Sequence, residues 1–140
     1  MKRKILVVDD EPGILELIRI KLTKKGFDVS TAKDEHEFFE QAFRNKPDLI
    51  ILDIWLGNEG GGTRLYDEVL DGGFDPAVPV IFMSALVEEG KPPKRASVGG
   101  KFALYGKPFD FDLLLEDICC LTGASKDEYI KINSDENKGT

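Results

Sequence analysis

The sequence predicts an α/β fold, with five parallel strands in a doubly wound sheet of order 2-1-3-4-5 and helices on both faces. Two observations carry this prediction. Short apolar runs alternate with amphipathic segments of helical length along the whole chain. The run Leu49–Leu52 is apolar without interruption, which is typical of a parallel strand covered on both faces. A chain of 140 residues also suits one domain with a single core.

The first half of the chain supplies three of the strands. The expected strands and helices cover 4–10, 12–26, 27–32, 34–46 and 48–53 in turn. Pro12 suits a first helical turn, Gly26 suits a helix end, and Pro47 ends the second helix. Helical spacing aligns two apolar sets, each along its own helix. They are Ile14, Leu17, Ile18 and Leu22 in the first helix, and Phe38, Phe39, Ala42 and Phe43 in the second.

The second half continues the alternation, with one interruption. The expected elements are a helix at 63–73, strands at 78–85 and 102–107, and a closing helix at 110–123. The segment 86–100 should hold the fourth helix, but Pro92 and Pro93 fall in its middle, so we expect that helix to be short, displaced or mobile. We therefore predict one domain over 1–123 and a polar extension over 124–140.

Composition excludes several classes of protein. A formal charge of −7 and a pI near 4.8 argue against direct nucleic-acid binding, which needs clustered basic residues. No apolar run approaches the roughly 18–20 residues of a membrane-spanning helix, and the apolar run near the N-terminus is too short for a signal peptide. We expect a cytoplasmic chain without membrane insertion. The adjacent Cys119 and Cys120 suit neither a structural disulfide nor a metal site.

Polar side chains gather where four of the predicted strands end. They are Asp9, Asp10, Asp53, Ser84 and Lys107. Because ligands of open parallel sheets bind at the carboxyl ends of the strands, these groups are expected to share one pocket. Crowded carboxylates need protons or a cation, and hard oxygen ligands favour Mg²⁺. One carboxylate can then attack phosphorus while a hydroxyl and an ammonium bind phosphoryl oxygens, which gives an aspartyl phosphate suited to a switch.

Each of these residues also has a simpler structural explanation. Asp10 or Glu11 would cap the first helix, Asp53 would cap the helix that follows it, and Lys107 would be a solvated surface lysine. The simpler explanations are independent of one another, whereas the five residues fall together at one edge of the sheet. Their joint occurrence therefore favours a phosphoryl-accepting site.

The chain resembles the receiver domain of two-component response regulators over residues 3–123. The motifs that carry the resemblance are "ILVVDDEP", "PDLIILDIWLGNEGG", "PVIFMSA" and "YGKPFD". The first and the last are specific in combination. The resemblance implies a flavodoxin-like fold of the chemotaxis-regulator type and a phosphorelay function. The domain would catalyse only its own phosphorylation and dephosphorylation, and would turn over no outside substrate.

The resemblance also assigns roles to individual residues. Asp53 is the implied phosphoacceptor, Asp10 a direct Mg²⁺ ligand, Asp9 a ligand through water, and Trp55 a ligand through its backbone carbonyl. Ser84 and Lys107 would contact the phosphoryl group, and the bond from Lys107 to Pro108 would be cis. The phosphoryl donor would be a histidine kinase or a histidine phosphotransfer protein. The output would be a changed affinity for a downstream protein, and a homodimer is left open. The lone His36 is expected on the surface.

The sequence departs from the family pattern in two places. Gly57 stands where the family usually has proline, and Gly60, Gly61 and Gly62 follow it, so we expect a less fixed start to the third helix. Leu104 occupies the position of the family's aromatic switch residue. The neighbouring Tyr105 should face the opposite side of its strand.

Two other classes of function remain alternatives. A phosphohydrolase of the haloacid dehalogenase type also uses an aspartate nucleophile with Ser/Thr, Lys and an acidic pair. That class needs an aspartate two residues after the nucleophile, where this chain has Trp55. The second alternative is a binding module with a receiver-like fold whose recognition of partners ignores phosphate. Turnover of a generic phosphate ester would favour the first, and the departures at Leu104 and 86–100 favour the second.

Overall fold

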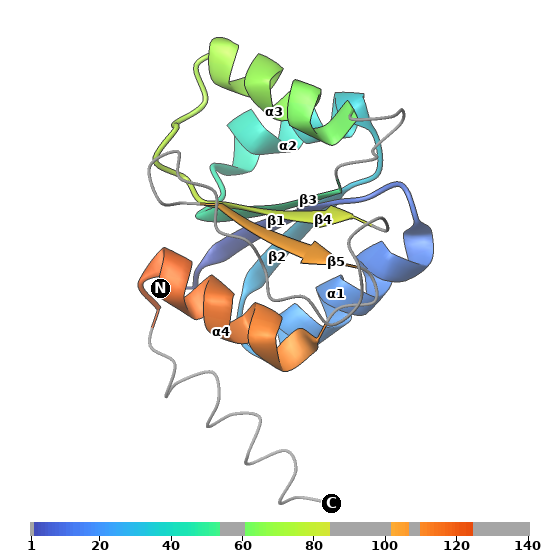
Figure 1. The fold of residues 1–140 in the computed structure, drawn as a ribbon, viewed down its shortest axis with the longest axis vertical. Coiled ribbons are helices and arrows are strands. Elements are labelled where there is room, and N and C mark those ends of the chain that lie inside the picture. Colours follow the sequence, from blue (N-terminus) through green and yellow to red (C-terminus); the bar gives the residue numbers. More distant parts are fainter. Residues whose placement is uncertain (1, 54–60, 85–101, 107–109, 125–140) are drawn as a thin grey trace, which may run out of the picture.

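The computed structural model describes residues 2–53, 61–84, 102–106 and 110–124 (Figure 1). Within them the order of elements is β1 (Lys4–Val8), α1 (Pro12–Lys24), β2 (Asp28–Ala32), α2 (Glu35–Asn45), β3 (Leu49–Asp53), α3 (Gly61–Asp71), β4 (Val80–Ser84), β5 (Phe102–Gly106) and α4 (Phe111–Thr122). The five strands form one parallel sheet of order β2-β1-β3-β4-β5. The predicted fold class and strand order are confirmed.

The sheet lies between two layers of helices, with α1 and α4 on one face and α2 and α3 on the other (Figure 1). Alternate residues of each central strand point to opposite faces. Ile5, Val7 and Ile51 pack toward α1 and α4, whereas Leu6, Val8, Ile50 and Leu52 pack toward α2 and α3. Full burial of one such aliphatic side chain contributes about 1.5–3 kcal/mol, so this double-sided burial accounts for the uninterrupted apolar strands.

Helix ends follow local chemistry that the sequence already contains. Asp34 and Asp110 are N-caps whose carboxylates accept backbone N–H bonds from the first turns of α2 and α4. Glycines in the left-handed region follow the ends of three helices: Gly26 (φ +97°) after α1, Gly73 (φ +102°) after α3 and Gly123 (φ +72°) after α4. The first strand ends at Val8, two residues earlier than predicted, because the Asp9 carboxylate turns the chain toward α1.

Two apolar side chains of the sets aligned by helical spacing are exposed. Leu17 is 44% exposed on α1 and Phe43 is 41% exposed on α2. In each helix the inward positions are other members of the same set, Ile18 and Leu22 in α1 and Phe38 and Ala42 in α2. A helix presents only a stripe to the sheet, so the flanks of a wide apolar face stay outside the core.

Several predictions fall on residues outside the described ones. They are the broken fourth helix at 86–100, the glycine-rich loop through Gly60 and the polar extension after Ala124. The boundary between a domain at 1–123 and an extension at 124–140 also stays a prediction. Among the residues that the structure describes, no helix is long and apolar enough to cross a membrane.

Candidate functional site

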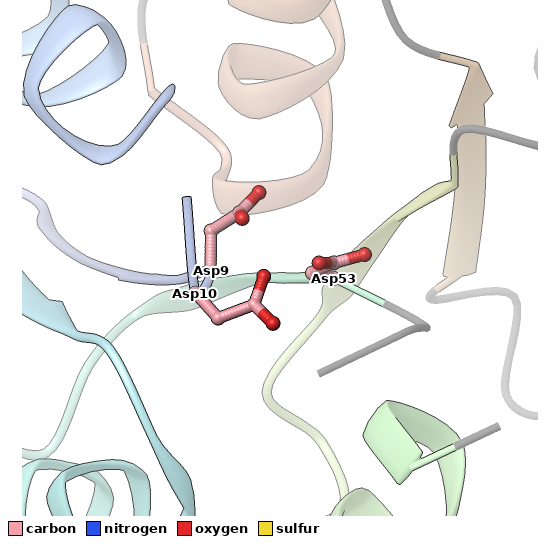
Figure 2. A group of neighbouring side chains, drawn as sticks. All are labelled: Asp9, Asp10 and Asp53. Carbon is pink, nitrogen blue, oxygen red and sulfur yellow. The ribbon is translucent and has the colours of Figure 1, made fainter. Parts of the chain in front are cut away.

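Three carboxylates come together at the carboxyl edge of the sheet (Figure 2). Asp9 directly follows β1 and Asp53 is the last residue of β3. Val8 and Leu52 are register partners in these neighbouring strands, so Asp9 and Asp53 lie side by side. Asp10 adds a third carboxylate, and one carboxylate oxygen from each residue lies within 4.8 Å of the others. The sequence prediction that these three residues meet is confirmed.

The three aspartates differ in their burial, and backbone hydrogen bonds fix Asp9. The backbone N–H of Asp9 donates to the carbonyl of Ala32 (3.1 Å), and its Oδ1 accepts from the N–H of Glu11 (2.9 Å). These bonds fix the turn that places Pro12 at the start of α1. Asp9 and Asp53 are only 2% and 4% exposed, whereas Asp10 is exposed. The cluster therefore has a buried base and one side that opens to solvent.

The helix-cap explanations do not account for these residues. Glu11 is the N-cap of α1 and makes no side-chain cap bond, and the carboxylate that accepts an N–H at this turn belongs to Asp9. Asp53 is separated from α3 by the residues up to Gly61, so it is not the N-cap of that helix. The bond from Glu11 to Asp9 was not predicted, although an aspartate side chain commonly accepts the backbone N–H two residues further on in a turn.

The donor set fits a hard divalent cation. In an octahedral Mg²⁺ site with ligands at about 2.1 Å, two protein oxygens lie about 3–4.2 Å apart, which is close to the observed grouping. Two negative charges about 4 Å apart repel by about 1 kcal/mol in water and about 4 kcal/mol at the dielectric typical of a protein surface. Buried carboxylates at this spacing are consistent with a cation, and the exposed side at Asp10 leaves room for water ligands. Mg²⁺ at this position would neutralise phosphoryl oxygens.

The remaining predicted site residues are located through the backbone or lie outside the described part. Asp53 pairs in register with Met83, so Ser84 ends β4 one residue beyond the level of Asp53. Ser84 pairs with Gly106, the last residue of β5, and Lys107 directly follows Gly106 in the sequence. Lys107 and Trp55 lie outside the described residues. The ends of four strands therefore converge on one edge, as predicted.

Comparison with known proteins identifies the family to which this chain belongs. The family model described as "Response regulator receiver domain" matches residues 5–119. The chain belongs to the response regulator receiver family. It is 35% identical over 116 residues to the transcriptional regulatory protein GlrR of Escherichia coli K12, an alignment that covers 81% of this chain and 25% of GlrR. Over 56 residues it is 50% identical to the alkaline phosphatase synthesis transcriptional regulatory protein PhoP of Bacillus subtilis, covering 40% of this chain and 23% of PhoP.

Solved structures give the same fold. The receiver domain of Francisella response regulator 1452 matches with a TM-score of 0.70 and 26% identity, over 89% of this chain and 100% of that one. Chemotaxis protein CheY4 of Vibrio cholerae matches with a TM-score of 0.69 and 23% identity, over 86% and 99%. This receiver spans about a quarter of the length of the curated relatives. It is thus a receiver domain of two-component signalling, and the haloacid dehalogenase alternative has no support.

The structure also has an apolar surface that the sequence pattern did not predict. Leu17 and Ile20 lie one turn apart on α1 and are 44% and 40% exposed. The available signal was the three-residue spacing of Leu17 and Ile20, which puts both side chains on one side of the helix. His36 is exposed as predicted, with its Nε2 3.7 Å from a carboxylate oxygen of Glu40 and no part in the acidic cluster.

Proposed function

We propose that this receiver accepts a phosphoryl group on Asp53 in a Mg²⁺-dependent reaction and thereby changes its affinity for a downstream protein. The observation that carries the proposal is the grouping of Asp9, Asp10 and Asp53, in which two carboxylates are buried at the carboxyl edge of the sheet. Among the described residues Asp53 is the group best placed as nucleophile, because β3 is buried along its whole length and delivers this carboxylate to the opening.

The reaction is a phosphoryl transfer from a phosphohistidine. A carboxylate oxygen of Asp53 forms a bond to phosphorus, and the bond from phosphorus to the imidazole nitrogen of the donor breaks. The imidazole leaves with the electron pair of that bond. Asp10 and Asp9 would hold Mg²⁺, directly and through water respectively, and the carbonyl of Trp55 would complete the ligand set. Ser84 and Lys107 would donate hydrogen bonds to the phosphoryl oxygens.

A histidine kinase or a histidine phosphotransfer protein would supply the phosphoryl group. Leu17 and Ile20 offer such a partner an exposed apolar surface on α1, the helix that begins just after the acidic pair. Leu17→Ser should slow transfer from any kinase that phosphorylates the wild-type chain. The same variant should leave phosphorylation by a small-molecule donor unchanged, because that reaction needs no protein contact. Equal kinase rates for both chains would rule this surface out.

The test of the central proposal is phosphorylation by a small donor. Acetyl phosphate with Mg²⁺ should add one phosphoryl group to the wild-type chain, seen by intact mass, and Trp55 fluorescence gives a second readout. Asp53→Ala should reduce the addition to background. Asp71→Asn removes an exposed carboxylate from the end of α3 and serves as the matched control, with addition expected at the wild-type level. Addition that persists in Asp53→Ala would refute Asp53 as acceptor.

The same experiment separates this function from a binding module that ignores phosphate. Such a module would show no addition with acetyl phosphate or phosphoramidate, with or without Mg²⁺. Chelation of Mg²⁺ should abolish addition to the wild-type chain, since the neutralising charge is then lost. The localisation in the cytoplasm and a homodimeric state stay predictions from the sequence.

A further inference from the structure

An open groove of about 530 Å³ lies at the amino edge of the sheet, the edge opposite the acidic cluster. Its walls come from parts of the chain that are far apart in sequence: Arg3 before β1, the end of α2 with the turn into β3, the turn from α3 into β4, and the last turn of α4. The volume falls within the range of known ligand sites. The phosphoacceptor chemistry uses none of these residues.

The groove is apolar along one wall. Phe43 is 41% exposed and lies edge-on to the buried Phe74, with ring centroids 6.0 Å apart and an interplanar angle of 85°. Leu121 of α4 and Pro79 before β4 add further apolar lining. An exposed aromatic ring at the side of a groove leaves apolar area that a bound partner would remove from water.

Two cations and two carboxylates line the groove, and backbone groups hold the carboxylates in place. Asp48 and Asp75 line the groove, but each carboxylate already accepts a backbone N–H, from Lys4 (2.7 Å) and Ala77 (2.9 Å) respectively. Arg3 and Lys46 supply the positive charges. An apolar segment that carries carboxylates beside it would match both the aromatic wall and these cations.

The chain itself carries such a segment next to the groove. Leu121 and Thr122 form part of the groove, Gly123 turns the chain in the left-handed region, and Ala124 packs against the core. The chain therefore leaves α4 at the groove. Sixteen residues follow, with the sequence "SKDEYIKINSDENKGT". The large apolar residues of this segment are Tyr129, Ile130 and Ile132, directly after the acidic pair Asp127 and Glu128.

We propose that the segment 125–140 of this chain binds back into the groove. Tyr129, Ile130 and Ile132 would cover the rings of Phe43 and Phe74, and Asp127 and Glu128 would lie beside Arg3 and Lys46. Tyr129 comes five residues after Ala124, a stretch that spans up to about 17 Å when extended, so the segment can return without displacing α4. The short connection gives the segment a high effective concentration at the groove.

The ion pairs can be trapped in the full-length chain with a zero-length carbodiimide cross-linker. The expected product is an amide between Lys46 Nζ and the side chain of Asp127 or Glu128, located by mass spectrometry after digestion. Lys46→Gln removes it. Lys33, an exposed lysine directly after β2 at the opposite edge of the sheet, serves as the control and should not couple to these acids.

A mixture of isotopically labelled and unlabelled copies decides whether the segment binds in its own chain. Binding within one chain gives only products in which both peptides carry the same label. Absence of the product, or products with mixed labels in statistical proportion, would overturn the proposal. Mixed labels would mean that the segment of a second copy fills the groove.

The apolar half of the proposal has a separate test by amide hydrogen exchange. Ile130→Ser combined with Ile132→Ser should raise exchange in the turn 72–78 by roughly two- to tenfold, because a segment that occupies its site from about half to about nine-tenths of the time protects it by that factor. The matched control, Asn133→Ser with Asn137→Ser, should exchange like the wild type. Identical exchange in the apolar variant would overturn the proposal. Neither double variant touches the described fold, so loss of folding does not confuse the result.

Discussion

The two edges of the sheet use aspartate in opposite ways. At the carboxyl edge Asp9 and Asp53 are buried and converge with Asp10 within 4.8 Å. At the amino edge Asp48 and Asp75 lie apart in the groove wall, and each accepts a backbone N–H from the start of a strand or from a turn. At the carboxyl edge the aspartates concentrate negative charge. At the amino edge they accept hydrogen bonds from the backbone and so fix a strand start and a turn.

The difference indicates which carboxylates serve function and which serve stability. A carboxylate that accepts a backbone N–H stabilises the folded chain, since a good acceptor replaces water. Carboxylates that crowd together without a cation destabilise it. Asp9 combines the two roles, because it accepts the Glu11 N–H while it faces Asp53. Stability measurements should therefore give opposite signs for substitutions at the two edges.

The largest expected effect is at Asp53. Asp53→Asn should raise the free energy of unfolding in Mg²⁺-free buffer by about 1–4 kcal/mol, because it removes repulsion between carboxylates whose oxygens lie within 4.8 Å of one another. Urea denaturation with a chelator present measures the change. Asp71→Asn should stay within about 0.5 kcal/mol of the wild type, as expected for an exposed site. Destabilisation by Asp53→Asn would mean that its carboxylate holds the fold and would break the contrast between the edges.

With Mg²⁺ present, the wild type should become more stable than Asp53→Asn. A ligand that binds only the folded chain stabilises it by about 2.7 kcal/mol at a concentration of 100 times its dissociation constant. The wild type should gain stability with Mg²⁺ and Asp53→Asn should gain much less, because one of its three carboxylates is gone. Thermal melts over a Mg²⁺ series test this. Equal gains in both chains would place the cation elsewhere.

At the amino edge, substitution of an aspartate should lower the free energy of unfolding. Asp48→Ala leaves the N–H of Lys4 without its 2.7 Å acceptor and should lower the free energy of unfolding by about 1 kcal/mol. Asp48→Asn keeps an acceptor oxygen and should recover most of the loss. Neither change should alter the response to Mg²⁺. A Mg²⁺ response that falls in Asp48→Ala would show that the two edges are coupled.

The smallest effect concerns Tyr66, which packs edge-on against Phe82 between α3 and β4. Burial, and secondarily the charge of Asp67, raise the pKa of Tyr66. The folded chain thus keeps the phenol proton more tightly than the unfolded chain. The resulting stability is present below the ordinary tyrosine pKa of about 10 and is lost as pH rises through the folded value. Tyr66→Phe should show a shallower alkaline loss of stability by denaturant titration. Parallel curves would contradict this.

Much of the fold and of the site was predictable from local patterns. Apolar runs of strand length, Pro12 at a helix start and Gly26 at a helix end are signals that act over a few residues. The position of Asp9 and Asp53 at strand ends also follows from such runs. The exposure of Leu17 and Phe43 did not follow, because helical spacing defines a face but not how much of that face the sheet covers.

The sequence by itself determined the order of the elements, the residues at which strands end and the kind of chemistry that those residues allow. Only the tertiary structure decided how closely the strand ends approach one another and which of their side chains are buried. The pairing of β1 with β3 brings Asp9 against Asp53, and the turn into α1 buries Asp9 while Asp10 stays exposed. The groove likewise exists only because four separate segments meet at one edge. These contacts depend on packing between distant parts of the chain, and local propensity does not encode them.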